Sequence, residues 1–254
     1  MESRESRMRV AIIDATDKRA VGFALRWAKH DDVNLIIGSK DKNAAMDNAE
    51  EIRNITGAPE DRVTAMKLND AAKNADIVVL TVPFQEQIPM LNEIKDYLNE
   101  DTIVVDTTLP IELEDGEPVF IQTEAGSCAQ QASQILGNKV KVVSAFKPLG
   151  AECLSEIDEE LTCDVIVCSD DADARKAVVN LAEKLTSLKI TEGPLSFDIL
   201  SEKFVATLVN WNKKWGQLCN VIRVPMEGVE GSMCSCVNPF LKVCMNRGIK
   251  CLSI

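Results

Sequence analysis

The feature that most constrains the fold is a series of short apolar runs separated by stretches of helical composition. The strongest runs are 10–13, 35–37, 77–82, 103–105, 140–143 and 165–167. Runs this continuously apolar are typical of strands buried on both faces, which requires helices on both sides of a sheet. Helical composition fills the gaps between them. The alternation therefore predicts an α/β fold with a doubly wound parallel sheet.

The chain divides into three parts on this pattern. Residues 1–7 are charged, precede the first strand and are expected to be a disordered extension. Residues 8–195 carry the βαβ pattern, and 196–254 form a C-terminal helical segment with a cysteine-rich tail. The last long helix, over 196–215, has an apolar stripe that either packs on the sheet or forms a dimer contact. The stripe consists of Phe197, Leu200, Phe204, Leu208 and Trp211.

Composition excludes several classes of protein. Hydrophobic residues make up 46% and charged residues 27% of the chain, which is typical of a globular protein. The net charge of −12 argues against nucleic acid or an anionic membrane as a partner. No apolar run approaches the roughly 20 residues that span a bilayer, and the charged first ten residues do not form a secretory signal. We expect a cytoplasmic protein.

Candidate metal and nucleophile sites are sparse. Cys234, Cys236, Cys244 and Cys251 lie close together in the tail, but their spacing departs from the paired spacing of structural zinc sites. Free thiols and a metal site both stay open, and no metal ligand is assigned. The nine carboxylates between 152 and 173 are interpreted as a solvated face rather than a cation site. His30 is the only histidine, so histidine-based hydrolysis is improbable.

Several local patterns together resemble a known family. The second strand ends in Gly38-Ser39-Lys40, a pattern that holds the 2′-phosphate of NADP in many Rossmann-like enzymes. The strand ends 80–83 and 143–145, the segment 164–171 and the Gly-Pro-Leu-Ser segment 193–196 follow in the same order as in that family. The chain over about 8–212 resembles the NADPH-dependent coenzyme F420 reductases, which implies a Rossmann-like NADP-binding domain over 8–195.

The resemblance implies ligands, a reaction and an assembly. The ligands are NADP and coenzyme F420, with hydride passing directly between nicotinamide C4 and deazaflavin C5. Such a step uses no protein acid, base or nucleophile, so no catalytic residue is predicted. The family's C-terminal part implies a homodimer. Predicted cofactor-binding residues are Thr16, Asp17, Lys18, Arg19, Ser39, Lys40, Thr81, Pro83 and Phe84; predicted substrate-binding residues are Ala145 and Lys147.

The chain departs from the family pattern at two places. The three fingerprint glycines after the first strand are replaced by Ala15, Asp17 and Ala20, and the Asp17 carboxylate would repel a pyrophosphate. Lys18 and Arg19 are expected to compensate. Lys147 replaces a family histidine, and it either meets an anionic ligand or is a solvated loop residue.

Two other functions therefore stay open. One is a family member that has lost dinucleotide binding and acts as a non-catalytic binding or regulatory protein. The other is an enzyme that uses the same scaffold for a different nucleotide-containing ligand.

Overall fold

The structure is a computed structural model that describes residues 7–14, 17–161, 163–185 and 188–215, with side chains up to 210. Thr16, most of the predicted N-terminal extension and the whole cysteine-rich tail lie outside the described residues. No helix in the described part of the chain is long and apolar enough to cross a membrane.

An eight-stranded sheet forms the centre of the molecule, with the strand order β10-β9-β8-β5-β4-β1-β2-β3. The six strands from β8 to β3 are parallel to one another. In chain order the strands of this sheet are β1 (Met8–Ile13), β2 (Val33–Ser39), β3 (Val63–Lys67), β4 (Ile77–Leu80), β5 (Ile103–Asp106), β8 (Lys141–Ser144), β9 (Asp164–Cys168) and β10 (Lys189–Gly193). This sheet confirms the predicted Rossmann-like α/β fold.

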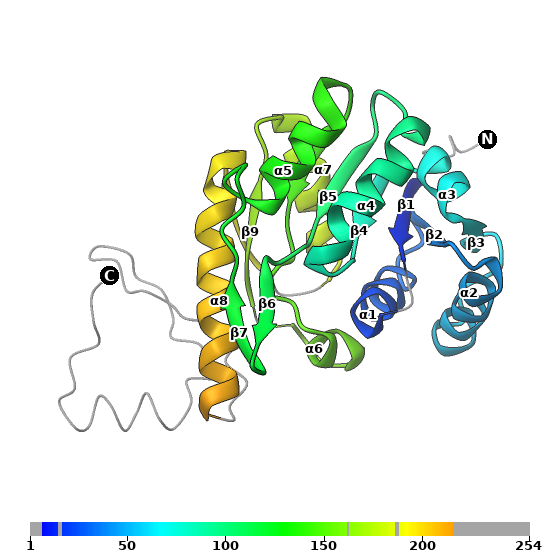
Figure 1. Cartoon of the computed structure of the whole chain (residues 1–254). Helices are drawn as coiled ribbons and strands as arrows, with labels where there is room; N and C mark the ends of the chain where they lie inside the picture. Colours follow the sequence, from blue (N-terminus) through cyan, green and yellow to red (C-terminus); the bar gives the residue numbers. More distant parts are fainter. Residues whose placement is uncertain (1–6, 15–16, 162, 186–187, 216–254) are drawn as a thin grey trace.

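Helices cover both faces of the sheet (Figure 1). One face is covered by α1 (Lys18–Trp27), α2 (Lys42–Thr56), α6 (Ala151–Ser155) and α7 (Ala172–Glu183). The other is covered by α3 (Leu68–Asn74), α4 (Phe84–Ile94) and α5 (Cys128–Leu136). Successive residues of β1 alternate between the two cores, with Val10 and Ile12 on the first face and Ala11 and Ile13 on the second. The central strands, such as β1 and β4, therefore need apolar residues at successive positions, which explains the continuous runs in the sequence.

The strand directions differ from the prediction at one edge of the sheet. β9 pairs with β8 antiparallel through Ser144 and Cys168, and β10 is parallel to β9. The chain between β8 and β9 contains only the short α6, so it does not form the long helical crossover that a parallel pair requires. The six strands from β8 to β3 are parallel as predicted, whereas β9 and β10 run in the opposite direction.

A hairpin between the β5 and α5 regions was not predicted. β6 (Ile111–Glu114) and β7 (Glu117–Phe120) pair antiparallel, and Asp115 and Gly116 form the turn with φ of 50° and 80°. Two left-handed residues in a two-residue loop match the twist of paired strands. The hairpin lies beside α8 (Asp198–Trp215) (Figure 1), and β7 contacts that helix.

The C-terminal helix α8 packs on the sheet domain with a polar inner face. Asp198, Ser201 and Glu202 are buried together with Val205 and Leu208. Phe197 and Leu200 are 52% and 60% exposed, so the predicted stripe is divided between the inside and the outside. The Trp211 side chain lies outside the described residues. The predicted division at 195/196 stays a prediction.

Candidate functional site

The predicted site residues gather at one edge of the sheet. Because six neighbouring strands are parallel, the segments that follow β1, β2, β4, β5 and β8 all meet at their carboxyl ends. Ligands of open α/β sheets bind at this edge, where the helices leave the strands. The edge therefore brings together residues that are more than 100 positions apart in the sequence.

The residue that follows β1 has a left-handed backbone conformation. Asp14 has φ of 59°, in the left-handed region that glycine adopts most easily. Asp17 is the N-cap of α1, and its Oδ1 accepts a hydrogen bond from the backbone N of Arg19 at 3.1 Å. Ala20 is fully buried in the core, which agrees with its replacing the glycine that allows close packing.

Close packing of α1 also depends on a glycine two residues after Ala20. A Cβ atom placed on Gly22 would lie 2.5 Å from the Leu154 Cβ and 3.2 Å from a Leu154 backbone carbon. α6 therefore rests directly on the backbone of α1. The Arg26 guanidinium strengthens this contact because it donates to four carbonyl oxygens in the segment around α6.

Arg19 connects α1 to the loops that follow β5 and β8. Its Nη1 donates to the Thr107 carbonyl at 3.1 Å, its Nη2 to the Phe146 carbonyl at 2.8 Å, and its Nε to the Leu149 carbonyl at 2.9 Å. Burial lowers the pKa of Arg19 to about 10, although Asp17 and Asp106 act in the opposite direction. The guanidinium stays charged at neutral pH, and the oxygens that accept its hydrogen bonds are all neutral. Such a charge attracts an anion at this edge.

The segment after β2 places one serine and one lysine at the same edge. Ser39 is buried, and its Oγ accepts a hydrogen bond from the backbone N of Asp41 at 3.3 Å. Lys40 is exposed, and its Nζ lies 2.7 Å from Oε2 of Glu93 on α4. Lys18 is exposed at the start of α1. Arg19 is therefore fixed by several hydrogen bonds, Lys40 is fixed by an ion pair, and Lys18 is exposed.

The residues after β4 border this edge from the next strand. Thr81 is buried, and its Oγ1 donates to the Ile13 carbonyl at 2.9 Å, so it fixes the end of β4 to the end of β1. Pro83 is the N-cap of α4 and is exposed, and Phe84 is half-buried. Of these three residues, only Pro83 and Phe84 leave side-chain surface open to a ligand.

The loop after β8 adopts an unusual backbone conformation. Ala145 is fully buried, and its backbone N donates to the Asp106 carbonyl at 3.2 Å. Phe146 has φ of 62°, which costs energy for a residue with a Cβ atom and is typically found at functional sites. Its buried ring packs against Phe23 and Trp27, with centroid distances of 5.3 and 5.8 Å. The strained backbone is thus held by aromatic packing and by Arg19.

Lys147 lies inside the protein, surrounded by carboxylates. Its Nζ is 3.0 Å from Asp106 Oδ2, 3.2 Å from Glu202 Oε1 and 3.4 Å from Asp198 Oδ2. It also donates to the Thr108 carbonyl at 2.5 Å. The lysine is 5% exposed, so the alternative of a solvated loop residue is wrong. The prediction of an anionic ligand on Lys147 stays untested, and its ammonium already has protein anions as partners.

Helix α5 supplies further partners to these acids. The backbone N of Cys128 donates to Glu202 Oε1 at 2.8 Å, and the backbone N of Ala129 donates to Asp198 Oδ2 at 3.3 Å. Both amides belong to the first turn of α5, where the helix dipole favours negative charge. The Ser144 hydroxyl donates to Asp198 Oδ1. The two acids of α8 therefore join that helix to β8 and to the amino end of α5.

The balance of charge in this cluster sets its titration. Three carboxylates face one ammonium, all from side chains that are at most 1% exposed. Burial opposes the charged form of Lys147, but the carboxylates outweigh it and raise the pKa of Lys147 well above its ordinary value. Burial raises the pKa of Glu202 to about 7, and the nearby ammonium only partly offsets this rise. The carboxyl group of Glu202 is therefore expected to titrate near neutral pH.

Asp106, Asp198 and Glu202 have the donor atoms of a cation site, within 4.8 Å of one another. The Lys147 ammonium already lies between these oxygens and supplies the positive charge. The carboxylates between 152 and 173 are mostly exposed, as expected of a solvated face. Lys147 was predictable from the sequence as a site residue, but its three acidic partners were not.

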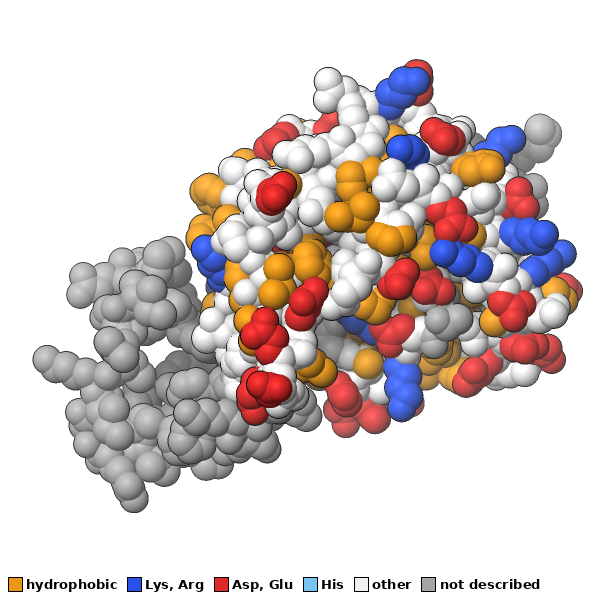
Figure 2. Space-filling model, in the orientation of Figure 1, with side chains coloured by type: hydrophobic (Ala, Val, Ile, Leu, Met, Phe, Trp, Pro, Cys, Tyr) orange, Lys and Arg blue, Asp and Glu red, His pale blue; other side chains and the backbone are white. Residues whose placement is uncertain are grey.

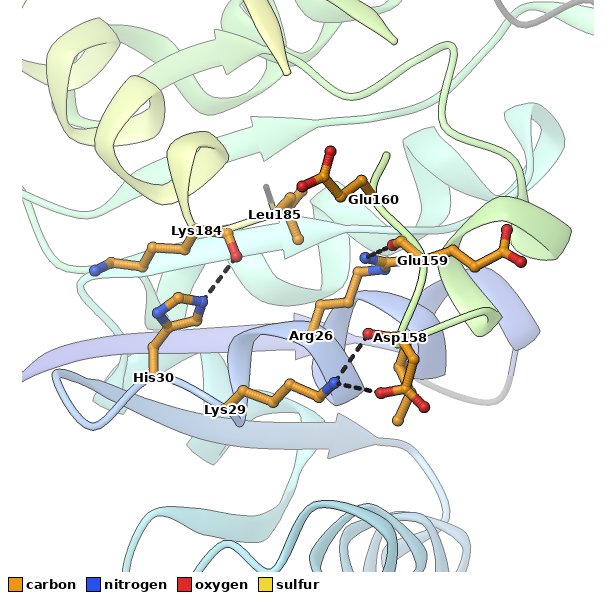
Figure 3. A pocket seen from close by; sticks show the side chains of 9 residues that line it. Arg26, Lys29, His30, Asp158, Glu159, Glu160, Lys184 and Leu185 are labelled. Carbon is orange, nitrogen blue, oxygen red and sulfur yellow. Dashed lines mark hydrogen bonds and ion pairs between the residues drawn. The ribbon is translucent and has the colours of Figure 1, made fainter. Parts of the chain in front are cut away.

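A small cleft of about 140 Å³ lies away from this edge, beyond the C-terminal end of α1 (Figure 3). His30 Nε2 lies 2.8 Å from the Lys184 carbonyl, and Lys29 Nζ donates to the Ile157 carbonyl at 2.9 Å. Asp17 is at the opposite end of the same helix. The cleft is therefore separate from the predicted cofactor site.

Comparison with known proteins decides the family. Residues 9–110 match the model of the family described as NADP oxidoreductase coenzyme F420-dependent. The chain is 35% identical over 209 residues to an F420-dependent NADP reductase of Methanothermobacter thermautotrophicus, covering 81% of this chain and 89% of that protein. The chain belongs to the F420-dependent NADP reductase family. A second member, from Methanocaldococcus jannaschii, is 29% identical over 85% of this chain and 98% of its own length.

Solved structures agree with this family fold. A candidate F420-dependent NADP reductase from Arthrobacter sp. FB24 superimposes with a TM-score of 0.69 at 19% identity, covering 82% of this chain and 95% of its own. The UDP-D-ManNAc dehydrogenase of Pyrococcus horikoshii follows with a TM-score of 0.58 at 8% identity, covering 77% of this chain and 49% of its own. At these identities the likeness concerns the fold alone.

The residues at the edge fit a dinucleotide, with one exception. The left-handed backbone of Asp14, the buried Ala20 and the guanidinium of Arg19 are compatible with a bound pyrophosphate, which needs close packing and positive charge. Asp17 is the exception, because its carboxylate already accepts a hydrogen bond from the first turn of α1. The sequence indicated this conflict, whereas the left-handed conformation of Asp14 was visible only in the structure.

Proposed function

We propose that this protein is a coenzyme F420-dependent NADP reductase that transfers hydride between NADPH and the deazaflavin. The observation that carries the proposal is family membership at 35% identity over most of both chains. The gathering of the predicted site residues at one sheet edge supports it. The bound cofactors supply the redox chemistry, as is usual for hydride transfer.

The chain's own residues would then bind and orient the two ligands. Thr16, Lys18 and Arg19 would hold the pyrophosphate, and Ser39 and Lys40 would hold the adenosine 2′-phosphate. Pro83 and Phe84 would bound the nicotinamide side. The loop at Ala145 and Phe146, which Arg19 and Lys147 hold from two sides, would form a rigid wall for the deazaflavin. A fixed wall is suited to holding reacting carbons about 3–3.5 Å apart.

A titration tests the binding part of this proposal. We expect NADPH to bind saturably to the pure protein, with a change in nicotinamide fluorescence, and to bind more tightly than NADH. No saturable NADPH binding up to millimolar concentration would contradict the proposal and would favour a member that has lost dinucleotide binding.

We also propose a homodimer and a cytoplasmic location. Leu200 on α8 is exposed, Phe204 one turn further along the helix is half-buried, and the exposed Phe197 directly precedes the helix. Hydrophobic side chains are exposed near the upper end of the outer edge in the view of Figure 2. A second copy of the same helix would cover them by a two-fold contact.

A further inference from the structure

Lys40 is held by an acid from another element before any phosphate reaches it. Lys40 follows β2 directly, and Glu93 lies near the end of α4. Their side chains meet with Nζ and Oε2 2.7 Å apart, although the two residues are distant in sequence. Both side chains are partly exposed, at 54% and 38%, so a ligand from solution can reach the pair.

Other acids near Lys40 also raise its pKa. The hydrogen bond with Glu93 raises the pKa of Lys40, although the slight burial lowers it, and the charges of Glu93, Glu86 and Asp14 raise it further. Lys40 is therefore charged at neutral pH, but its charge is already balanced by anions. Glu93 differs from the other two acids because it occupies a hydrogen-bonding position on Nζ.

A phosphate group on Lys40 would have to compete with Glu93. A phosphate monoester carries close to two negative charges at neutral pH, and a carboxylate within hydrogen-bond distance of the same ammonium repels it. The 2′-hydroxyl of NADH carries no charge and does not meet this repulsion. Glu93 thus penalises one nicotinamide cofactor more than the other.

We propose that Glu93 is a specificity-determining residue that competes with the adenosine 2′-phosphate for Lys40 and so lowers the preference for NADPH over NADH. The inference rests on the proposed function, because it takes Lys40 as the 2′-phosphate ligand. It assigns to Glu93 a role opposite to that of a binding residue, since its removal strengthens binding. Because the side chains of Lys40 and Glu93 are partly exposed, solvent screens their interaction, and the effect of Glu93 on NADPH affinity is moderate.

The test compares dissociation constants for NADPH and NADH by nicotinamide fluorescence at low ionic strength. Glu93→Gln keeps the size and polarity of the side chain and removes its charge. We expect it to lower the Kd for NADPH roughly fivefold, the scale of a partly screened ion pair, and to change the Kd for NADH less than twofold. Raising the salt concentration should shrink the difference between variant and wild type.

Two matched variants separate a local effect from a change in net charge. Glu60→Gln makes the same charge change at an exposed turn between α2 and β3 and should leave both constants unchanged. In a Lys40→Met background, Glu93→Gln should lose most of its gain, because the residue for which it competes is absent.

The outcomes separate this inference from the proposed function. Wild type that binds NADPH, together with a Glu93→Gln variant of equal NADPH affinity, would overturn the inference alone. An equal gain for NADH would overturn it as well, since the 2′-phosphate would then be irrelevant. If neither wild type nor the variant binds NADPH, the proposed function falls and the inference falls with it.

Discussion

The carboxylate of Asp17 accepts a hydrogen bond from the backbone N of Arg19 at 3.1 Å, so an acid of the chain itself closes the amino end of α1. The first turn of a helix is where dinucleotide-binding folds hold a pyrophosphate. Asp17 therefore stabilises the helix and opposes the proposed ligand at the same atom. Arg19 offsets this through a charge whose hydrogen bonds all go to neutral oxygens.

Removing the Asp17 charge is expected to strengthen NADPH binding. Asp17→Gly should tighten binding about tenfold, or about 1.4 kcal/mol, because it frees the amide of Arg19 and removes a like charge. Asp17→Asn keeps a capping oxygen and isolates the effect of charge. Isothermal titration with NADPH measures both variants. Weaker binding by both would show that Asp17 contributes to the site.

Lys147 is expected to be essential for the stability of the fold. Lys147→Met leaves three buried carboxylates without their ammonium and should lower the free energy of unfolding by about 3–5 kcal/mol. Urea denaturation at pH 7 measures the change. Lys139→Met, at an exposed position before β8, is the control and should cost less than about 1 kcal/mol. A similar small loss for both variants would contradict the buried ion cluster.

Glu202 is expected to make stability depend on pH in a defined interval. Because burial raises its pKa to about 7 from an ordinary value near 4.5, the folded state binds a proton more tightly than the unfolded state. Its contribution is therefore present below about pH 4.5 and is lost as the pH rises towards 7, by about 3 kcal/mol. Urea denaturation between pH 5 and 8 should show this loss in wild type and a flatter profile in Glu202→Gln. Equal slopes would contradict it.

The apolar face of α8 is expected to form the contact between two copies. Leu200 is 60% exposed, so Leu200→Glu should leave the fold intact and place a charge in the contact. Light scattering at micromolar concentration should give the mass of two chains for wild type and of one chain for the variant. A wild-type mass of one chain would contradict the proposed homodimer.

The sheet was predictable because its strands are buried on both faces and so have few polar positions. The direction of β9 was not, since an apolar run reads the same in either direction and the crossover through α6 is short. The hairpin carried a usable signal in Asp115-Gly116, a common two-residue turn, but its charged flanks resembled a loop.

The buried cluster was less accessible to sequence analysis. Asp106 and Asp198 are 92 positions apart, and charged residues are ordinarily solvated, so only the tertiary structure brings them to Lys147. One local signal existed. Asp198 and Glu202 are one helical turn apart, and Val205 and Leu208 continue their face, so two acids interrupt a buried apolar stripe.

The most direct measurement follows the transferred hydride itself. The protein is incubated with coenzyme F420 and NADPH carrying deuterium at the transferred C4 position, and the reduced deazaflavin is analysed by mass spectrometry. The account predicts loss of the oxidised deazaflavin absorbance and one deuterium retained at C5 of the product, because the transfer is direct. Unchanged deazaflavin, or reduced product without deuterium, would contradict it.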